Sequence, residues 1–251
     1  MNDRRNEENM SKTTPEYTGF LVINKPAGIT SHDVVDRVRK VLGLRKVGHL
    51  GTLDPLGTGV LVLAVGRATK SVKYFVDDDK DYQATILLGT ITDTQDTDGK
   101  VIETRDYSAI TRDSVEALLK HFTGRINQIP PMVSAKKIKG ERLYKLHRKG
   151  IEVPREPKEI EIYKLKIESF NLPEVQIFLS CSKGTYVRTL CADIGEKLGC
   201  GGCMSSLVRV RSGCFSLSDA YKLEEIEKMS AGEVSKIILQ IHDVYLKRGQ
   251  K

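Results

Sequence analysis

The stretch Gly48-His49-Leu50-Gly51-Thr52-Leu53-Asp54-Pro55-Leu56-Gly57-Thr58-Gly59 surrounds a single carboxylate with four glycines and one proline. Glycine permits positive φ and lets the backbone approach a ligand closely. Pro55 biases Asp54 toward an extended conformation. We therefore expect a stiffened, open loop over residues 46–59 that presents Asp54. No Gly-Lys-Ser/Thr follows, so the loop is not of the phosphate-binding type. By this pattern alone, an Asp before Pro is more often a turn residue than a catalyst.

The segments on either side of the loop predict mixed helix and strand structure. Residues 20–23 and 60–65 are short apolar runs typical of buried strands. Thr30 or Ser31 can cap a helix through about Leu42, whose valines recur on one face. Further strands are predicted at 82–88, 160–167, 175–181 and 207–210, and further helices at 111–122, 184–198 and 223–245. Helices and strands do not alternate regularly, which favours an α+β fold with a mixed, largely antiparallel sheet over a doubly wound one. A phase slip in residues 160–167 predicts a β-bulge.

Composition restricts the classes of partner and location. The chain has 251 residues and 40 Lys plus Arg against 33 Asp plus Glu, a formal charge of +7 that favours an anionic partner without naming one. Residues 1–16 are polar and predict a disordered leader rather than a signal peptide. No apolar run approaches the length of a membrane span. We therefore expect a cytoplasmic protein that does not contact membranes.

Cysteine spacing raises the question of a metal. There are five cysteines, an odd number that argues against a disulfide framework. Cys200-Gly-Gly-Cys203 has the spacing of a zinc knuckle, but structural zinc sites usually show two close pairs. We expect reduced thiols and no metal site.

The loop around Asp54 resembles the signature of the TruB family of pseudouridine synthases, Gly-His-x-Gly-x-Leu-Asp-Pro-x-x-x-Gly, and matches each fixed position. Other blocks are similar in the family's order and together cover roughly residues 19–215. They are Asn24-Lys25-Pro26-Ala27-Gly28-Ile29-Thr30-Ser31-His32, Tyr82 with Leu88-Gly89 and residues 92–96, Pro130-Pro131-Met132-Val133-Ser134-Ala135 with Gly140, and residues 182–189 with Asp193-Ile194-Gly195. The resemblance implies a pseudouridine-synthase-like core with an RNA-binding insertion.

The resemblance also implies roles for three catalytic residues. Asp54 is the expected nucleophile, attacking C6 of the base or C1′ of the sugar, and the sequence does not choose between these routes. Arg188 is expected to keep Asp54 ionised and oriented. Tyr82 is expected to stack on the base and to serve as a base in proton transfer. Without the resemblance, Arg188 is a phosphate contact or a surface residue, and Tyr82 a core tyrosine. Neither route requires a cofactor.

The implied substrate is a uridine in the T-loop of tRNA, at position 55, flipped out of its stack. His49 is expected to pack among the displaced nucleotides, which offsets the cost of extrusion. Tyr186 and Leu207 are expected to line the uracil pocket, and Lys25 of the first block to contact the substrate.

A basic segment follows the proline pair. Residues 135–150 hold seven Lys or Arg against one acid, a composition that suits a phosphate backbone or, alternatively, a solvated helix face. The family places here, at about residues 128–151, a flexible insertion that closes over the T-arm. Lys136, Lys137 and Lys139 are the expected contacts.

The C-terminal region departs from the family pattern. Residues 17–215 are predicted to form the catalytic domain, and residues 216–251 a short helical tail with no room for a full RNA-binding module of the PUA type. We expect a monomer without an obligatory protein partner and a weaker grip on the acceptor side of tRNA. Two alternatives are an RNA-binding protein without chemistry and an RNA-guided synthase in a ribonucleoprotein. The intact Asp54, Tyr82 and Arg188 argue against the first, and the basic insertion argues against the second.

Overall fold

A computed structural model describes residues 17–134, 137–138 and 140–249 of the chain. The predicted leader, residues 1–16, lies outside the described residues. A mixed sheet of ten strands, most of them antiparallel neighbours, forms the core and confirms the predicted α+β class. Its main path runs β14-β1-β3-β12-β4-β11-β10-β7, and β2 and β13 pair with β3 and β12.

The sheet strands are β1 (Gly19–Lys25), β2 (Val47–His49), β3 (Thr58–Val65), β4 (Lys80–Leu88), β7 (Gly124–Gln128), β10 (Lys158–Asn171), β11 (Glu174–Cys181), β12 (Gly202–Ser212), β13 (Phe215–Ser216) and β14 (Tyr221–Lys222). Two small hairpins pair β5 (Thr90–Thr92) with β6 (Val101–Thr104) and β8 (Lys137–Ile138) with β9 (Glu141–Arg142). The helices are α1 (Ser31–Leu42), α2 (Val72–Phe75), α3 (Arg112–Leu119), α4 (Leu143–Arg148), α5 (Val187–Lys197), α6 (Leu223–Lys228), α7 (Ala231–Ile237) and α8 (Ile241–Gly249).

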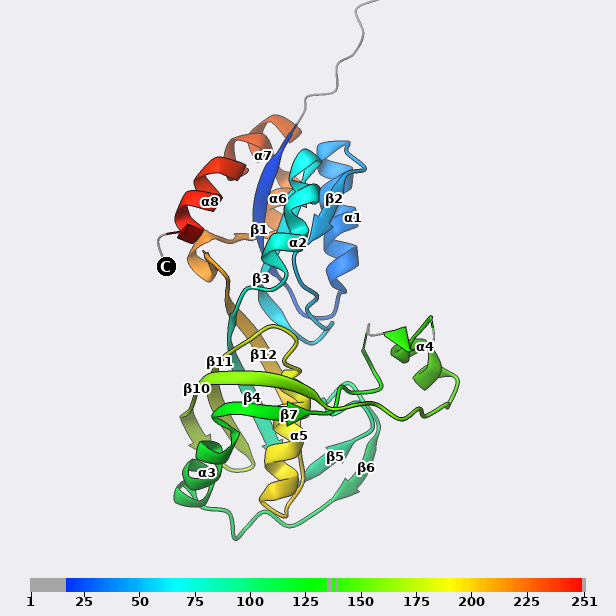
Figure 1. Cartoon of the computed structure of the whole chain (residues 1–251), viewed down its shortest axis with the longest axis vertical. Coiled ribbons are helices and arrows are strands. Elements are labelled where there is room, and N and C mark those ends of the chain that lie inside the picture. The colour runs from blue at the N-terminus through cyan, green and yellow to red at the C-terminus, as the bar shows by residue number, and fades with distance from the viewer. Residues whose placement is uncertain (1–16, 135–136, 139, 250–251) are drawn as a thin grey trace, which may run out of the picture.

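Strands β1 and β3 are apolar on both faces because helices cover both faces. Alternate residues such as Leu21 and Ile23 join the main apolar core with α1, α6 and α7. Their neighbours Phe20 and Val22 join a second cluster with Phe75 and residues of α8. Figure 1 shows these helices gathered around β1 and β3 at one end of the molecule, with α3 and α5 at the other end. The long β12 continues from one end to the other beside both β3 and β4.

Several predicted elements are found with changed limits. The helix predicted from Thr30 is α1, with a capping box at Thr30 and a left-handed Gly43 at its end. The strand predicted at residues 207–210 is part of the longer β12. The start of β12 at Gly202 packs closely against Gly195 of α5. The helix predicted over 184–198 begins only at Val187, and that over 223–245 is three helices, α6, α7 and α8. The bulge in β10 is confirmed by two register shifts against β11.

The C-terminal residues pack onto the N-terminal strand. Strand β14 pairs in parallel with β1, and Leu239 exchanges backbone hydrogen bonds with Phe20 at 2.8 and 2.9 Å. Among the described residues, no helix has the length and apolar character needed to cross a membrane.

Candidate active site

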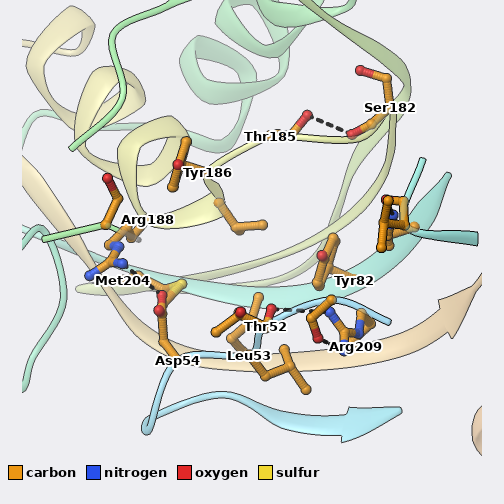
Figure 2. Close-up of a pocket in the computed structure, with 17 residues that line it drawn as sticks. Thr52, Leu53, Asp54, Tyr82, Ser182, Thr185, Tyr186, Arg188, Met204 and Arg209 are labelled. Carbon is orange, nitrogen blue, oxygen red and sulfur yellow. Dashed lines mark hydrogen bonds and ion pairs between the residues drawn. The ribbon is translucent and has the colours of Figure 1, made fainter. Parts of the chain in front are cut away.

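The loop between β2 and β3 is held by side chains from β1 and α1. The Ser31 hydroxyl donates to the Leu53 carbonyl at 2.9 Å and accepts from the Leu53 N–H at 2.8 Å. The Gly57 N–H closes a turn on the Asp54 carbonyl at 3.0 Å. The backbone on both sides of Asp54 is therefore fixed, and its carboxylate points toward Arg188 (Figure 2).

Lys25 has a position different from the expected one. It is fully buried, and its Nζ donates to the carbonyls of Pro26, Pro55 and Gly57 at 2.8, 3.2 and 2.7 Å. Burial lowers its pKa to about 8, and the nearby Asp54 carboxylate opposes that shift. Because its ammonium donates to three backbone carbonyls and has no exposed surface, Lys25 supports the loop from behind, and the expectation of a substrate contact is wrong for this structure.

The carboxylate of Asp54 is paired with a buried arginine. Arg188 Nη2 lies 3.0 Å from Asp54 Oδ2, and Arg188 Nη1 lies 3.3 Å from Oδ2 of the buried Asp96. The same Nη2 donates to the Val133 carbonyl at 2.7 Å. Burial raises the pKa of Asp54, Arg188 opposes that shift, and Asp96 adds to it. One guanidinium thus orients the acid and offsets the cost of keeping it ionised in a half-buried position.

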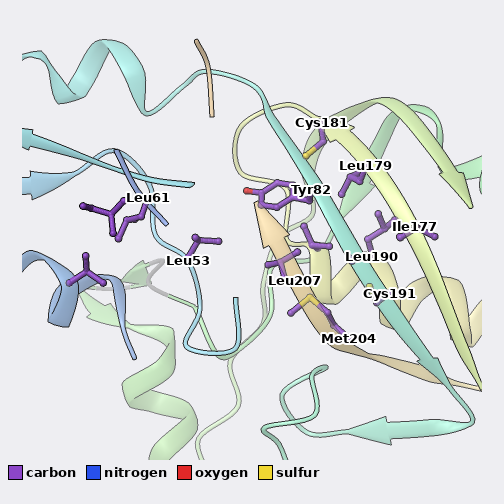
Figure 3. Close-up of a cluster of buried hydrophobic side chains, with 14 of the residues drawn as sticks. Leu53, Leu61, Tyr82, Ile177, Leu179, Cys181, Leu190, Cys191, Met204 and Leu207 are labelled. Carbon is purple, nitrogen blue, oxygen red and sulfur yellow. The ribbon is translucent and has the colours of Figure 1, made fainter. Parts of the chain in front are cut away.

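Tyr82 lies on β4 facing the same cavity. It is 8 % exposed, and burial raises the pKa of its phenol while the neighbouring Arg209 charge lowers it. Figure 3 places Tyr82 beside Leu207 and Cys181, at the margin of the apolar core. The ring therefore has a fixed orientation before any ligand arrives.

Seventeen residues enclose a cavity of about 270 Å³ between the loop, β4, β12 and the start of α5. Asp54, Tyr82, Arg188, Tyr186 and Leu207 all line it, so five of the predicted site residues come together. The size suits a small planar ring rather than a large ligand. A carboxylate, an aromatic face and an apolar wall in one cavity can hold a base while Asp54 attacks it.

His49 is not among the residues that line this cavity. It ends β2, half-buried, and its Nδ1 is buried with no hydrogen-bond partner among the described residues. Burial, followed by the charge of Arg209, lowers its pKa. A neutral ring at the end of β2 can pack against displaced nucleotides, and this role of His49 stays a prediction.

The basic insertion is described only in part. Lys136 and Lys139 lie outside the described residues, and of Lys137 only the backbone, in β8, is described. The side chain of Leu143 is fully buried at the start of α4, and Lys149 is exposed and pairs with Glu141 at 2.7 Å. Figure 1 shows α4 on an arm that extends away from the sheet.

Sequence reasoning did not single out three buried polar residues at the site. Asp96 holds the second side of Arg188, Gln128 bonds the backbone of Tyr186, and Arg209 bonds the loop. Asp96 belongs to the block of residues 92–96, and Arg209 to the strand predicted at 207–210. The local sequence does not show which way either side chain points. The five cysteines are buried and form no disulfide, and the described residues contain no group of three metal-ligating side chains.

Two family models match this chain. A family model described as TruB family pseudouridylate synthase (N terminal domain) matches residues 39–187. A second, described as tRNA pseudouridylate synthase B C-terminal domain, matches residues 188–244. The chain belongs to the TruB family. The second match includes most of the segment predicted as a short tail.

Relatives of the TruB family share long stretches with this chain. The tRNA pseudouridine synthase B of Geotalea uraniireducens (strain Rf4) is 52% identical over 207 residues, which are 82% of this chain and 67% of the relative. That of Geobacter sulfurreducens is 49% identical over 226 residues, 90% of this chain and 74% of the relative. That of Opitutus terrae is 42% identical over 233 residues, which are 93% of this chain and 97% of the relative.

A solved structure shares the fold. In the crystal structure of a Cbf5-Nop10-Gar1 complex, one chain superposes with a TM-score of 0.73 at 28% identity. The match covers 92% of this chain and 62% of that one. The TruB-family chain described here thus spans less than two thirds of that structural relative.

Proposed function

We propose that this chain is a tRNA pseudouridine synthase that converts one uridine of the T-loop, position 55, to pseudouridine. The observation that carries the proposal is the Asp54–Arg188 pair, 3.0 Å apart in a cavity that Tyr82 also lines. Family membership and relatives named tRNA pseudouridine synthase B support the choice of tRNA.

The reaction is an isomerisation and needs no external reactant. The bond from C1′ to N1 breaks, the uracil turns, and a new bond joins C1′ to C5. Asp54 attacks one fragment and holds it covalently while the other reorients. The Tyr82 oxygen in its ionised form takes the proton that C5 loses, and that proton then passes through solvent to N1, which returns Tyr82 to its starting form and balances atoms and charge. Arg188 keeps Asp54 ionised for the attack.

The uridine has to leave its stack before it can enter the cavity. Extrusion costs a few kcal/mol, which contacts to the flipped base and to the gap it leaves offset. We assign the base contacts to Tyr82, Tyr186 and Leu207, which line the cavity. We assign the gap to His49, supported by its half-buried position at the end of β2.

The basic insertion is proposed to close over the T-arm. Its composition of seven bases and one acid over residues 135–150 supports contact with phosphates. We further propose that the enzyme acts as a monomer, without guide RNA or partner protein, in the cytoplasm where its tRNA substrate is found.

Label release from tRNA tests the activity. Unmodified tRNA tritiated at C5 of uridine is incubated with purified protein alone, and tritium release is followed. Wild type should release label, whereas Asp54→Asn should release none and still bind tRNA, because an amide is not a nucleophile. Asp36→Asn, at an exposed acid of α1, is the matched control and should behave as wild type. If the wild-type protein releases no label from T-arm substrates, the proposed synthase activity is wrong.

The insertion is tested by salt dependence. Replacing Lys136, Lys137 and Lys139 by Ala should weaken tRNA binding and reduce the slope of log K against log salt by about 1 for each lost phosphate contact. An unchanged slope would mean that the three lysines are solvated and do not touch RNA.

A further inference from the structure

Arg209 is a buried arginine that bonds the catalytic loop. It lies on β12, is 2 % exposed, and donates from Nε to the Val60 carbonyl at 2.7 Å. Nη1 donates to the Thr52 carbonyl at 3.3 Å and Nη2 to the Gly51 carbonyl at 3.1 Å. The planar fork of an arginine fixes the relative positions of its acceptors. Arg209 therefore ties the backbone two residues before Asp54 to the start of β3.

The same guanidinium reaches Tyr82. Arg209 lies directly opposite Tyr82 in the antiparallel pairing of β12 with β4, so both side chains share the cavity face. Both side chains line the same cavity, and the positive charge of Arg209 lowers the pKa of the Tyr82 phenol against the larger effect of burial, which raises it. Figure 2 shows Arg209 beside Thr52 of the loop, with Tyr82 above them in the view. One side chain thus contacts the two segments that carry the nucleophile and the aromatic ring.

Close packing fixes the backbone of Arg209 itself. Arg209 is also the parallel partner of Gly59, where β3 leaves the loop. A Cβ on Gly59, whose φ is +93°, would lie 2.3 Å from the Arg209 carbonyl oxygen. That position therefore requires glycine, and the approach leaves β12 no freedom to slide against β3.

The charge of Arg209 has no counter-ion among the described residues. Its hydrogen-bond partners are three neutral backbone carbonyls, whereas Arg188 and Arg211 pair with carboxylates. A buried cation without a counter-ion is costly, and the three carbonyl hydrogen bonds offset part of that cost here. The charge of Arg209 lowers the pKa of Tyr82, and of Lys25, Lys80 and His49 nearby.

We propose that Arg209, on β12 directly opposite Tyr82, is a positioning residue of the active site, which holds the Gly51–Thr52 backbone and places its positive charge on the cavity face that Tyr82 shares. The inference rests on the proposed function, because it gives Tyr82 the proton-accepting role. The charged and titratable groups that act on Tyr82 are Arg209 from β12, Cys181 from β11 and Asp54 from the loop. Of these three groups, Arg209 alone favours the ionised form of Tyr82.

Arg211 provides a matched control on the same strand. A register shift between Arg209 and Arg211 turns Arg211 to the opposite side of the sheet from the cavity, where it forms a 2.6 Å ion pair with Asp81. Arg211→Lys therefore tests the loss of an arginine fork on β12 away from the active site. Arg209→Lys keeps the charge and loses the fork, and Arg209→Gln keeps a donor and loses the charge.

Wild type, Arg209→Lys, Arg209→Gln and Arg211→Lys are compared. For each protein we measure the single-turnover rate of tritium release, the dissociation constant for RNA and the midpoint of thermal unfolding. Arg209→Lys should react about tenfold more slowly and Arg209→Gln about 100-fold more slowly, with RNA binding within about threefold of wild type. The rate–pH profile of Arg209→Gln should move to higher pH by about one unit, and that of Arg209→Lys should not. Arg211→Lys should keep the wild-type rate.

Wild-type rates in both Arg209 variants, an equal loss of rate in Arg211→Lys, or an unshifted profile in Arg209→Gln would overturn the proposal. A second readout does not depend on the reaction. Phenol ionisation is titrated by ultraviolet absorbance for wild type and Arg209→Gln, each against its Tyr82→Phe derivative. Tyr82 should ionise at higher pH in Arg209→Gln. A wild type that released no tritium would refute the proposed function, and this titration would still decide whether Arg209 acts on Tyr82.

Discussion

Arg188 Nη2 lies 3.0 Å from the carboxylate of Asp54, and its other terminal nitrogen lies 3.3 Å from the buried Asp96. The arginine is 5 % exposed on its side chain and also donates to the carbonyl of Val133, which lies in the insertion just before its basic residues 135–150. Hence the nucleophile, the segment after β5 and the base of the insertion meet at one guanidinium. A movement of the insertion would shift Arg188 through its bond to Val133, and with it the position of the Asp54 carboxylate.

Replacing Arg188 by Met should slow single-turnover label release by at least about 100-fold. Burial already raises the pKa of Asp54, and Arg188 opposes that rise. Without the guanidinium the pKa climbs further, the reactive carboxylate forms only at higher pH, and the acid limb of the rate–pH profile moves upward. Arg105→Met, at an exposed arginine paired with Glu103 and Glu196, is the control. An acid limb at the wild-type position would contradict this account of the pair.

Gln128 and Tyr186 are joined by two hydrogen bonds. The Gln128 amide donates to the Tyr186 carbonyl at 3.0 Å and accepts from the Tyr186 N–H at 2.8 Å. Gln128→Leu leaves both backbone groups unpaired just before α5, at a cost of about 1–3 kcal/mol each if they stay buried. We expect the midpoint of thermal unfolding to fall and label release to slow by about tenfold. Gln83→Leu, whose amide bonds Glu168 at the surface, should change neither.

Lys25 predicts a pH dependence of stability. Its folded-state pKa of about 8 is below the usual 10.5 because the ammonium is buried. Between these two values the unfolded chain binds more protons than the folded one, so raising the pH favours folding. The free energy of unfolding of wild type relative to Lys25→Met should therefore rise from about pH 8 to about pH 10.5 and be flat below pH 8. Denaturant unfolding at each pH measures it, with exposed Lys46→Met as control. A flat difference across the upper window would disprove the shift.

Much of the fold could be predicted because its signals are local. The apolar runs at 20–23 and 60–65 are strands buried on both faces, and the period of 160–167 revealed the bulge in β10. The cap at Thr30 fixed the start of α1. The polar, turn-rich residues 93–100 are typical of a connection between two strands, and they join β5 to β6.

The site divides in the same way between local and distant information. The loop sequence by itself determined that Asp54 is presented by a stiff, glycine-rich backbone, and the family motif named Tyr82 and Arg188 with it. The tertiary structure decided the role of Lys25, because its ammonium donates to three backbone carbonyls and the residue is fully buried. A lysine in a motif has no fixed environment until distant backbone surrounds it.

Arg209 and Arg211 show the limit most clearly. Residues two apart in a regular strand share a face, so the sequence predicts that these two arginines point the same way. A bulge in β12 reverses that parity, and only Arg209 reaches the loop and Tyr82. Sequence determined which residue types this protein has available for its chemistry. Pairing between strands far apart in the chain decided which of them meet, because strand register depends on the partner and not on the strand alone.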